Sequence, residues 1–287
     1  MATGADTGRV PGRVRVPRRL LTASGLALVA LVALASAASA QFGGRGFSPA
    51  RIATDQDYDG RFHYCRVVYR TSFDGFGGNW TTDYPRADIN LSIRLGELTR
   101  TDVSMGGGEP NHQLVRLSGP ELYRCPLVIM SAPGRALLDE GDARALRAYL
   151  EKGGLLWTDD FWGEYQWAHW EAQLRKALPA GEFPIVDVPL DHPLFRTQFE
   201  VSEIPQIPNI GFFTRTGGRT SEMGVESETP RVRGILDASG RLMVVMTHNT
   251  DIADSWEREA DDPTYFLTFG PKGYAFGINT VLYSLTH

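Results

Sequence analysis

The chain has 287 residues, of which 42% are hydrophobic and 22% are charged, and its formal net charge at pH 7 is −5. The first 40 residues carry five Arg and one Asp, which leaves 24 basic and 33 acidic side chains in the remaining 247 residues, a net charge of −9. That sign disfavours nucleic acid as a partner, and the length suffices for one large domain with its own core.

Residues 1–40 have the features of a signal peptide. Arginines precede an apolar run at residues 20–35, and the Ala-Ser-Ala sequence at residues 38–40 fits a cleavage site before Gln41. The alternative is an uncleaved membrane anchor, although the run is shorter than the ~20 residues that span a bilayer. We therefore expect export to the periplasm or cell envelope, with membrane contact only through this segment if it stays uncleaved.

Residues 41–56 are Gly-rich and have no hydrophobic period, which predicts a flexible linker before a single domain at residues 57–287. Strand and helix patterns then alternate, except in a Pro- and Gly-rich insertion at about residues 189–240 that contains a candidate β segment at residues 210–215. The predicted strands are residues 63–70, 114–117, 127–130, 155–157, 185–188 and 241–247, and the predicted helices outside the central unit are residues 83–100, 162–178 and 274–285.

The central unit of the predicted fold is residues 125–163. An apolar strand is followed by a helix for which Asp139 or Asp142 is the N-terminal cap, and Gly153 ends that helix before the next strand. Such a βαβ unit is right-handed, and its two parallel strands end at the same edge of the sheet, where α/β proteins bind ligands. The sequence therefore predicts an α/β fold with a mostly parallel sheet, helices on both faces and a crevice at that edge.

Three polar clusters each follow an apolar strand, and a parallel sheet would bring them to that crevice. They are residues 75–83, 159–160 and 248–257. Each cluster alone could be explained by helix capping or by a turn. Together they contain more carboxylate and imidazole groups than capping needs. The candidate ligand-binding residues are Trp80, Asp83, Asp159, Asp160, His248, Asn249, Asp251 and Asp254.

These side chains allow two kinds of chemistry. Carboxylate oxygens suit a hard divalent cation, so a divalent cation is a candidate cofactor, and an Asp–His pair can serve as acid and base in hydrolysis. The sequence contains no Gly-x-Ser-x-Gly or Gly-x-Cys-x-Gly elbow, no His-Glu-x-x-His and no Cys-x-x-Cys. A covalent Ser or Cys hydrolase is therefore disfavoured.

The two cysteines, Cys65 and Cys125, each stand at the start of an apolar strand pattern. If those strands are parallel neighbours, the two thiols lie close together at the edge opposite the crevice, where an exported protein could oxidise them to a disulfide. Two buried free thiols are the alternative. In either state they are distant from the predicted crevice and are not expected to act as nucleophiles.

Four motifs in order resemble the bacterial domain of unknown function family 4159. They are Gly78-x-Trp80-x-x-Asp83-Tyr84-Pro85-x-Ala87-Asp88-x-Asn90-Leu91, Leu150-x-x-Gly153-Gly154-x-Leu156-x-x-Asp159-Asp160, Asp191-His192-Pro193 and His248-Asn249-x-Asp251-x-x-Asp254-x-Trp256-Glu257. The resemblance covers about residues 62–286. It implies a flavodoxin-like three-layer sandwich similar to class I glutamine amidotransferases, in exported or envelope proteins, and no established activity. The chain lacks a cysteine at a strand-to-helix elbow, which argues against glutamine hydrolysis.

The function expected from the sequence is a noncatalytic ligand-binding or interaction module of the cell envelope, whose partner is a small molecule or an envelope protein. The mixture of carboxylates and aromatic residues suits a sugar or a peptide fragment better than a phosphate ester. The alternative is a metal-assisted or acid/base hydrolase of an envelope carbohydrate or amide, with Asp160 or His248 as the general base.

Overall fold

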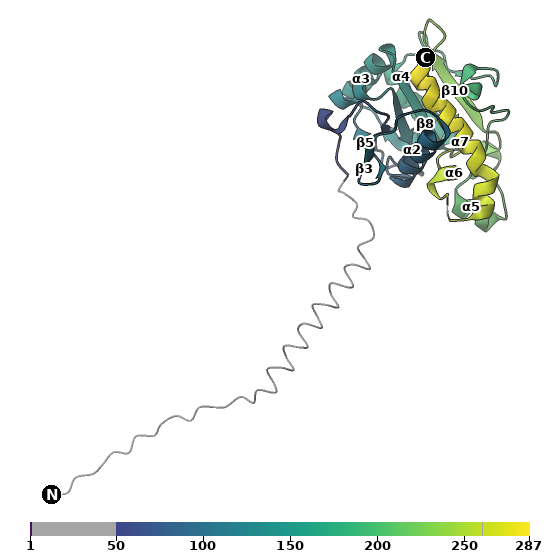
Figure 1. Cartoon of the computed structure of the whole chain (residues 1–287). Coiled ribbons are helices and arrows are strands. Elements are labelled where there is room, and N and C mark those ends of the chain that lie inside the picture. Colours follow the sequence, from purple (N-terminus) through teal and green to yellow (C-terminus); the bar gives the residue numbers. More distant parts are fainter. Residues whose placement is uncertain (2–49, 260) are drawn as a thin grey trace. The chain divides into compact units, whose positions relative to one another are not determined.

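The structure, a computed structural model, describes Met1 and residues 50–259 and 261–287. The rest of the predicted signal peptide, residues 2–40, and residues 41–49 of the predicted linker lie outside the described residues. A single compact unit extends over Arg51–His287 and thus begins inside the predicted linker (Figure 1). Its first residues join the sheet, because the Ala53 amide donates to the Leu114 carbonyl at 2.8 Å. Among the described residues, no helix has the length and apolar character needed to cross a membrane.

A seven-stranded sheet forms the middle layer, and five adjacent strands of it are parallel, as the sequence predicted. The last two strands, on one side, pair antiparallel. The spatial order is β5 (His112–Val115), β1 (Tyr64–Val67), β6 (Leu127–Ser131), β8 (Leu155–Phe161), β11 (Leu242–His248), β10 (Arg231–Leu236) and β9 (Val186–Asp187). Two small pairs lie outside this sheet, β2 (Arg70–Thr71) with β7 (Ala136–Leu137) and β3 (Met105–Gly106) with β4 (Glu109–Pro110).

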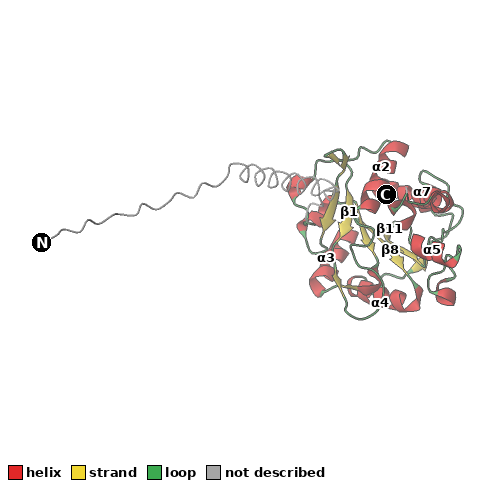
Figure 2. Cartoon of the chain, turned by 90° about the horizontal axis from the view of Figure 1, so that it is seen from below, coloured by secondary structure: helices red, strands yellow, loops and turns green. Residues whose placement is uncertain are grey.

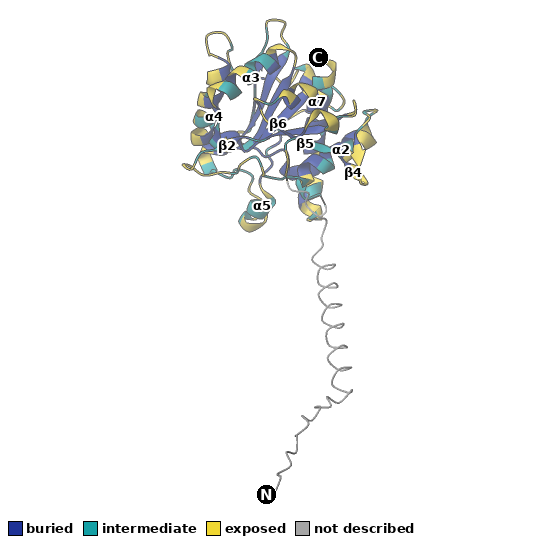
Figure 3. Ribbon diagram, turned by 90° about the vertical axis from the view of Figure 1, so that its left-hand side faces the viewer, coloured by how far each residue is buried: buried dark blue, intermediate teal, exposed yellow. Residues whose placement is uncertain are grey.

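Helices cover both faces of the sheet, which confirms the three-layer α/β prediction (Figure 2). Alternate residues of β6 point to opposite faces, so Val128 and Met130 belong to one buried cluster and Leu127 and Ile129 to the other. The central strands are buried on both sides (Figure 3). The first face packs against α3 (Glu140–Glu151) and α4 (Gly163–Ala177), and the second against α2 (Arg86–Leu98), α6 (Asp254–Glu257) and α7 (Pro263–Thr286).

The N-terminus of α3 follows the capping pattern expected from the sequence. Asp139 is the N-cap, and its side chain accepts a hydrogen bond from the Asp142 amide at 2.8 Å. The chain leaves the helix through Gly153, whose φ of 104° is open to glycine at little cost. The Asp139 cap and the Gly153 stop thus set where α3 begins and ends, and β8 starts directly after that stop.

Replacing the cap by Asp139→Ala is expected to lower the free energy of unfolding by about 1 kcal/mol, because the first turn of α3 loses a hydrogen-bond acceptor for its free amides. Urea denaturation followed by circular dichroism measures the change. Glu140→Ala, at an exposed position of the same turn, is the control and should cost less. Equal losses in the two variants would contradict the capping role.

Two parts of the predicted irregular insertion are regular. The expected β segment at residues 210–215 is wrong, because α5 (Ile210–Thr216) occupies it. Asn209 caps this helix by accepting from the Gly211 amide at 2.9 Å, and Gly217 ends it at φ 69°. Strand β10 also lies within the insertion. Its sequence was not predicted as a strand because Arg residues alternate with other residues in its first half, so it contains no unbroken apolar run. Such alternation fits a strand with one polar face.

Two helices have bounds that differ from the prediction. Helix α2 begins at Arg86, because Asp83 adopts a φ of 63° that cannot continue a helix. Helix α7 begins at Pro263 and is longer than predicted, since Asp262 caps it and the helix continues through Pro271. The first difference matters for function, because it places Asp83 in a loop before the helix.

Candidate functional site

The predicted convergence of polar clusters is found at the carboxyl edge of the parallel strands. Ser131 at the end of β6 pairs with Asp159 of β8, and His248 at the end of β11 pairs with Phe161. A cavity of about 360 Å³ opens at this edge, and we call it the acidic pocket. It is lined by Phe76, Gly77, Gly78, Thr82, Asp83, Asp160, Trp162, Gln166, Asn209, Glu222, Met223 and Asp251.

Three carboxylates beside this pocket form a tight group that we call the Asp triad: Asp83, Asp251 and Asp254. One oxygen from each lies within 4.8 Å of the others. The Asp254 amide donates to Oδ1 of Asp251 at 3.0 Å, and Oδ2 of Asp254 accepts from the Ile210 amide at 3.1 Å. Oδ1 of Asp254 and Oδ2 of Asp83 are buried and have no hydrogen-bond partner among the described residues.

Asp159 and Asp160 are adjacent in β8 but have different surroundings. Asp159 is buried and accepts from the Thr247 hydroxyl at 2.5 Å and from the Ala253 amide at 3.0 Å, so it ties β8 to the loop after β11. Asp160 lines the acidic pocket, and its Oδ1 accepts from the Trp162 indole at 3.1 Å. Asp159 therefore supports the site, whereas Asp160 is exposed to a ligand in the pocket.

The electrostatics of these carboxyl groups reflect burial and mutual repulsion. Burial raises the pKa of Asp83 to about 7 and that of Asp159 to about 6. Burial, together with the neighbouring carboxylates, raises the pKa values of Asp160, Asp251 and Asp254 well above the usual range. The folded protein therefore binds protons at this cluster more readily than ordinary Asp side chains do.

Backbone strain is concentrated in the same region. Among the described residues, four that are not glycine have positive φ: Asp83 (63°), Ala132 (50°), Asp160 (60°) and Asn249 (63°). Three of them lie at the ends of β6, β8 and β11, and Asp83 lies in the loop that lines the pocket. Such conformations cost on the order of 1–3 kcal/mol each and occur preferentially at functional sites. The strain therefore supports the choice of this edge as the site.

A buried arginine that the sequence reasoning missed holds the loop that carries Asp83. Arg66 in β1 is fully buried and forms a bidentate ion pair with Asp88 of α2. It also donates to the Trp80 carbonyl at 3.2 Å, the Thr82 carbonyl at 2.8 Å and the Ser131 hydroxyl at 2.7 Å. One feature of the sequence could have revealed this role: Arg66 is a charged residue within an otherwise apolar strand pattern.

Gln166 of α4 was also missed, and it fixes the other end of this loop. Its Nε2 donates to the Phe76 carbonyl at 3.2 Å, and its Oε1 accepts from the Trp162 amide at 2.9 Å. Gly77 lies against it, since a Cβ atom at residue 77 would stand 2.9 Å from Nε2 of Gln166. Glu222 and Asn209, from the predicted insertion, complete the pocket lining.

Five of the eight predicted site residues lie outside the pocket lining: Asp159 and Asp254, which are buried, and His248, Asn249 and Trp80. The imidazole of His248 stacks on Phe161 with ring centroids 5.0 Å apart, its Nε2 lies 3.1 Å from the Gly163 carbonyl, and burial lowers its pKa to about 4. Oδ1 of Asn249 accepts from the Gly163 amide at 2.8 Å. Trp80 packs edge-on against Tyr84. These contacts give His248, Asn249 and Trp80 structural roles at the strand edge.

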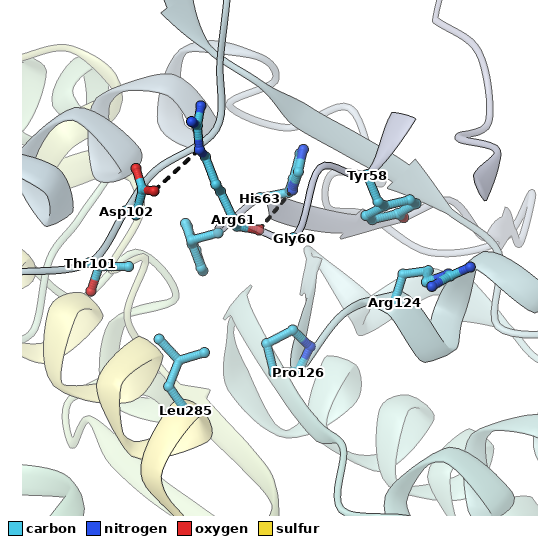
Figure 4. Close-up of a pocket in the computed structure, with 10 residues that line it drawn as sticks. Tyr58, Gly60, Arg61, His63, Thr101, Asp102, Arg124, Pro126 and Leu285 are labelled. Atoms are coloured by element: carbon cyan, nitrogen blue, oxygen red, sulfur yellow. Dashed lines mark hydrogen bonds and ion pairs between the residues drawn. The ribbon is translucent and has the colours of Figure 1, made fainter. Parts of the chain in front are cut away.

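A second cavity, of about 470 Å³, lies at the opposite edge of the sheet (Figure 4). Its charged side chains are already paired, since Arg61 lies 3.2 Å from Asp102 and Arg124 lies 2.9 Å from Asp55. Cys65 and Cys125 form a disulfide at this side of the molecule. Because its charges are neutralised, this cavity has weaker features of a binding site than the acidic pocket.

Comparison with known proteins gives a family but no characterised relative. The family model described as "Domain of unknown function (DUF4159)" matches residues 63–285, which is most of the chain and includes every residue of the Asp triad. None of the curated proteins compared with the chain matches it.

Proposed function

The chain belongs to the family of domains of unknown function DUF4159, and from this premise we propose that its acidic pocket binds a small ligand rich in hydroxyl or amino groups. The observation that carries the proposal is the composition of the lining. It contains the carboxyl side chains of Asp83, Asp160, Glu222 and Asp251, and no Lys or Arg is among the described residues that line it. Carboxylates accept hydrogen bonds, so the matching ligand donates them.

Aromatic residues at the pocket support a sugar or amino sugar as this ligand. Phe76 lines the pocket and stacks on Tyr165 with ring centroids 5.8 Å apart. The two rings remain about half exposed, at 48% and 50%. An exposed aromatic surface can pack against the apolar C–H face of a sugar ring while carboxylates accept from its hydroxyls. A phosphate ester is disfavoured, because it would add negative charge to an acidic cavity.

A binding module, without turnover, is the best-supported form of this function. The pocket lining contains no Ser or Cys nucleophile among its described residues. The imidazole of His248 stacks on Phe161, and its Nε2 contacts the Gly163 carbonyl. We place this module outside the cytoplasm, in the periplasm or cell envelope. The signal-peptide pattern of residues 1–40 and the Cys65–Cys125 disulfide support that location.

Hydrolysis is the second candidate, favoured by one property of Asp160. Burial and neighbouring carboxylates raise its pKa well above the usual range, and a raised pKa is the property that a carboxyl group needs to act as the general acid for a leaving group. Turnover of a glycoside or amide by the wild-type chain, lost in Asp160→Asn without loss of melting temperature, is the result that would favour hydrolysis.

A thermal-shift titration with hexoses, hexosamines and hexose phosphates tests the binding proposal. A hexosamine at about a hundred times its Kd is expected to stabilise the wild-type chain by ~2.7 kcal/mol, with hexoses weaker and hexose phosphates without effect. Glu222→Gln and Asp160→Asn should weaken the response, because each removes a charged acceptor from the pocket. Asp102→Asn at the opposite edge is the matched control. Equal responses in all variants, or none in the wild type, would overturn the proposal.

A further inference from the structure

We propose that the Asp triad (Asp83, Asp251 and Asp254) is the binding site of a hard divalent cation, with Ca²⁺ as the best match. The inference deepens the proposed function and rests on it in one respect, because the cation would form part of the surface that the pocket offers to its ligand. The cation site itself is supported by four separate observations.

The first observation is the set of unpartnered oxygens. Asp254 is 1% exposed, and its Oδ1 has no hydrogen-bond partner among the described residues; Oδ2 of Asp83 is also buried and unpartnered. A buried polar atom without a partner is costly, and a buried carboxylate oxygen more so. Asp251 and Asp254 each use one carboxylate oxygen to accept a backbone hydrogen bond, so their orientation is set by other contacts.

The second observation is charge. Among the described residues, no Lys, Arg or His forms an ion pair with Asp83, Asp251 or Asp254; Arg66 instead pairs with Asp88, and Arg258 with Glu257 and Asp261. Three carboxylates therefore lie within 4.8 Å of one another without a basic partner, and a bound cation would supply the missing positive charge. A divalent ion balances more of this negative charge than a monovalent ion does.

The third observation is geometry. Carboxylate oxygens that bind one Ca²⁺ ion lie about 2.3–2.6 Å from it, so two such oxygens are at most about 5 Å apart. The three triad oxygens lie within 4.8 Å of one another, which meets this limit. Mg²⁺ demands a nearly ideal octahedron and loses its waters reluctantly, whereas Ca²⁺ accepts varied geometries, so a partly buried group of three carboxylates suits Ca²⁺ better.

The fourth observation is the open side of the site. Asp83 and Asp251 line the acidic pocket, whereas Asp254 is buried beside them. Three carboxylates supply fewer oxygens than the six to eight that Ca²⁺ takes, and water or ligand hydroxyls can fill the remaining positions from the pocket. Neighbouring hydroxyls of a sugar would coordinate the ion in this way, so the cation gives the pocket a preference for vicinal diols.

Equilibrium dialysis of the chelator-treated full chain against Ca²⁺, followed by elemental analysis, tests the cation site. We expect one ion per wild-type chain and a rise in Tm on the order of 5–10 °C at saturating Ca²⁺. Asp251→Asn and Asp254→Asn should each weaken binding by at least about 10- to 100-fold, since even residues behind a metal ligand have effects of that size. Asp102→Asn, which removes an exposed carboxylate at the opposite edge, should bind as the wild type does.

A second readout guards against variants that fail to fold. Without Ca²⁺ at pH 8, Asp251→Asn and Asp254→Asn should melt at a higher temperature than the wild type. Each variant removes one negative charge from three carboxylates that lie within 4.8 Å of one another, while an Asn oxygen still accepts the backbone hydrogen bond. The lack of saturable Ca²⁺ binding at millimolar concentration, or unchanged binding in both variants, would overturn the inference. Preference for Mg²⁺ would overturn the assignment to Ca²⁺.

The same samples separate this inference from the proposed function. If a sugar binds equally well in chelator and in Ca²⁺, the proposed sugar-binding function is supported, and a role of the cation in sugar binding is contradicted. An ion that binds when no hexose or hexosamine produces a response supports the cation site and contradicts the proposed ligand class.

Discussion

Asp88→Ala is expected to lower the free energy of unfolding by about 3–5 kcal/mol, because it leaves the guanidinium of Arg66 buried without its anionic partner. Both side chains of this pair have zero exposure, so water cannot replace the lost carboxylate. Urea denaturation measures the change. The control is Asp102→Ala, which breaks an exposed ion pair with Arg61 and should cost no more than about 1 kcal/mol.

A double variant distinguishes the stabilising role of this ion pair from its positioning role. Arg66→Met combined with Asp88→Leu replaces the pair by apolar side chains and is expected to recover much of the stability. It also removes the donors to the Trp80 and Thr82 carbonyls, which hold the loop next to Asp83. We therefore expect the double variant to fold and to bind Ca²⁺ more weakly than the wild type. Wild-type affinity in the folded double variant would show that Arg66 does not position the triad.

The second large effect is the dependence of the protein's stability on pH. In chelator, the wild-type chain should lose stability as the pH rises from about 5 to about 8. The folded pKa values of Asp83 and Asp159, about 7 and about 6, exceed the unfolded value of ~3.9, so over this window the folded state binds more protons than the unfolded state. Stability then falls with rising pH, beginning above the unfolded pKa and continuing through the folded values. A tenfold difference in proton affinity between the folded and unfolded states corresponds to about 1.4 kcal/mol for each group, and several carboxyl groups contribute.

The direction follows first from burial, which disfavours the charged form of each carboxyl group. The ionisable groups around the five carboxyls are mostly acidic or tyrosine side chains, and the two arginines among them, Arg66 and Arg258, have other acidic partners. The others include Tyr64, Tyr69, Asp88, Glu222, Glu257 and Tyr265. Repulsion between the carboxylates adds to the effect of burial as protons leave.

Melting curves at several pH values, recorded with chelator and with Ca²⁺, measure this dependence. A decrease in Tm on the order of 10 °C is expected in chelator. In Ca²⁺ the decrease should be smaller or absent, because the ion binds the deprotonated carboxylates and its affinity rises with pH. Asp251→Asn should flatten the curve in chelator. A wild-type Tm in chelator that stays constant or rises across this window would contradict the assignment of raised pKa values to the cluster.

Local sequence signals determined much of the fold. The apolar run of β6, the cap at Asp139 and the stop at Gly153 each act over a few residues, so the central βαβ unit could be predicted from sequence. The convergence of Asp83, Asp160 and Asp251 at one strand edge also followed, because parallel strands joined by right-handed crossovers must end together. Helix α5 and strand β10 were missed because neither has an apolar period of its own.

The tertiary structure decided which polar side chains enter the pocket. At the strand ends the chain turns through positive φ at Asp160 and Asn249, where the alternation of a strand no longer predicts a direction. Asp160 therefore lines the pocket, whereas His248, at the end of β11, stacks on Phe161. The role of Arg66 also required the fold, since its partners lie at residues 80, 82, 88 and 131. The sequence by itself determined the edge at which the site lies, because that depends on strand order and direction; the composition of the site depends on long-range contacts that no local pattern encodes.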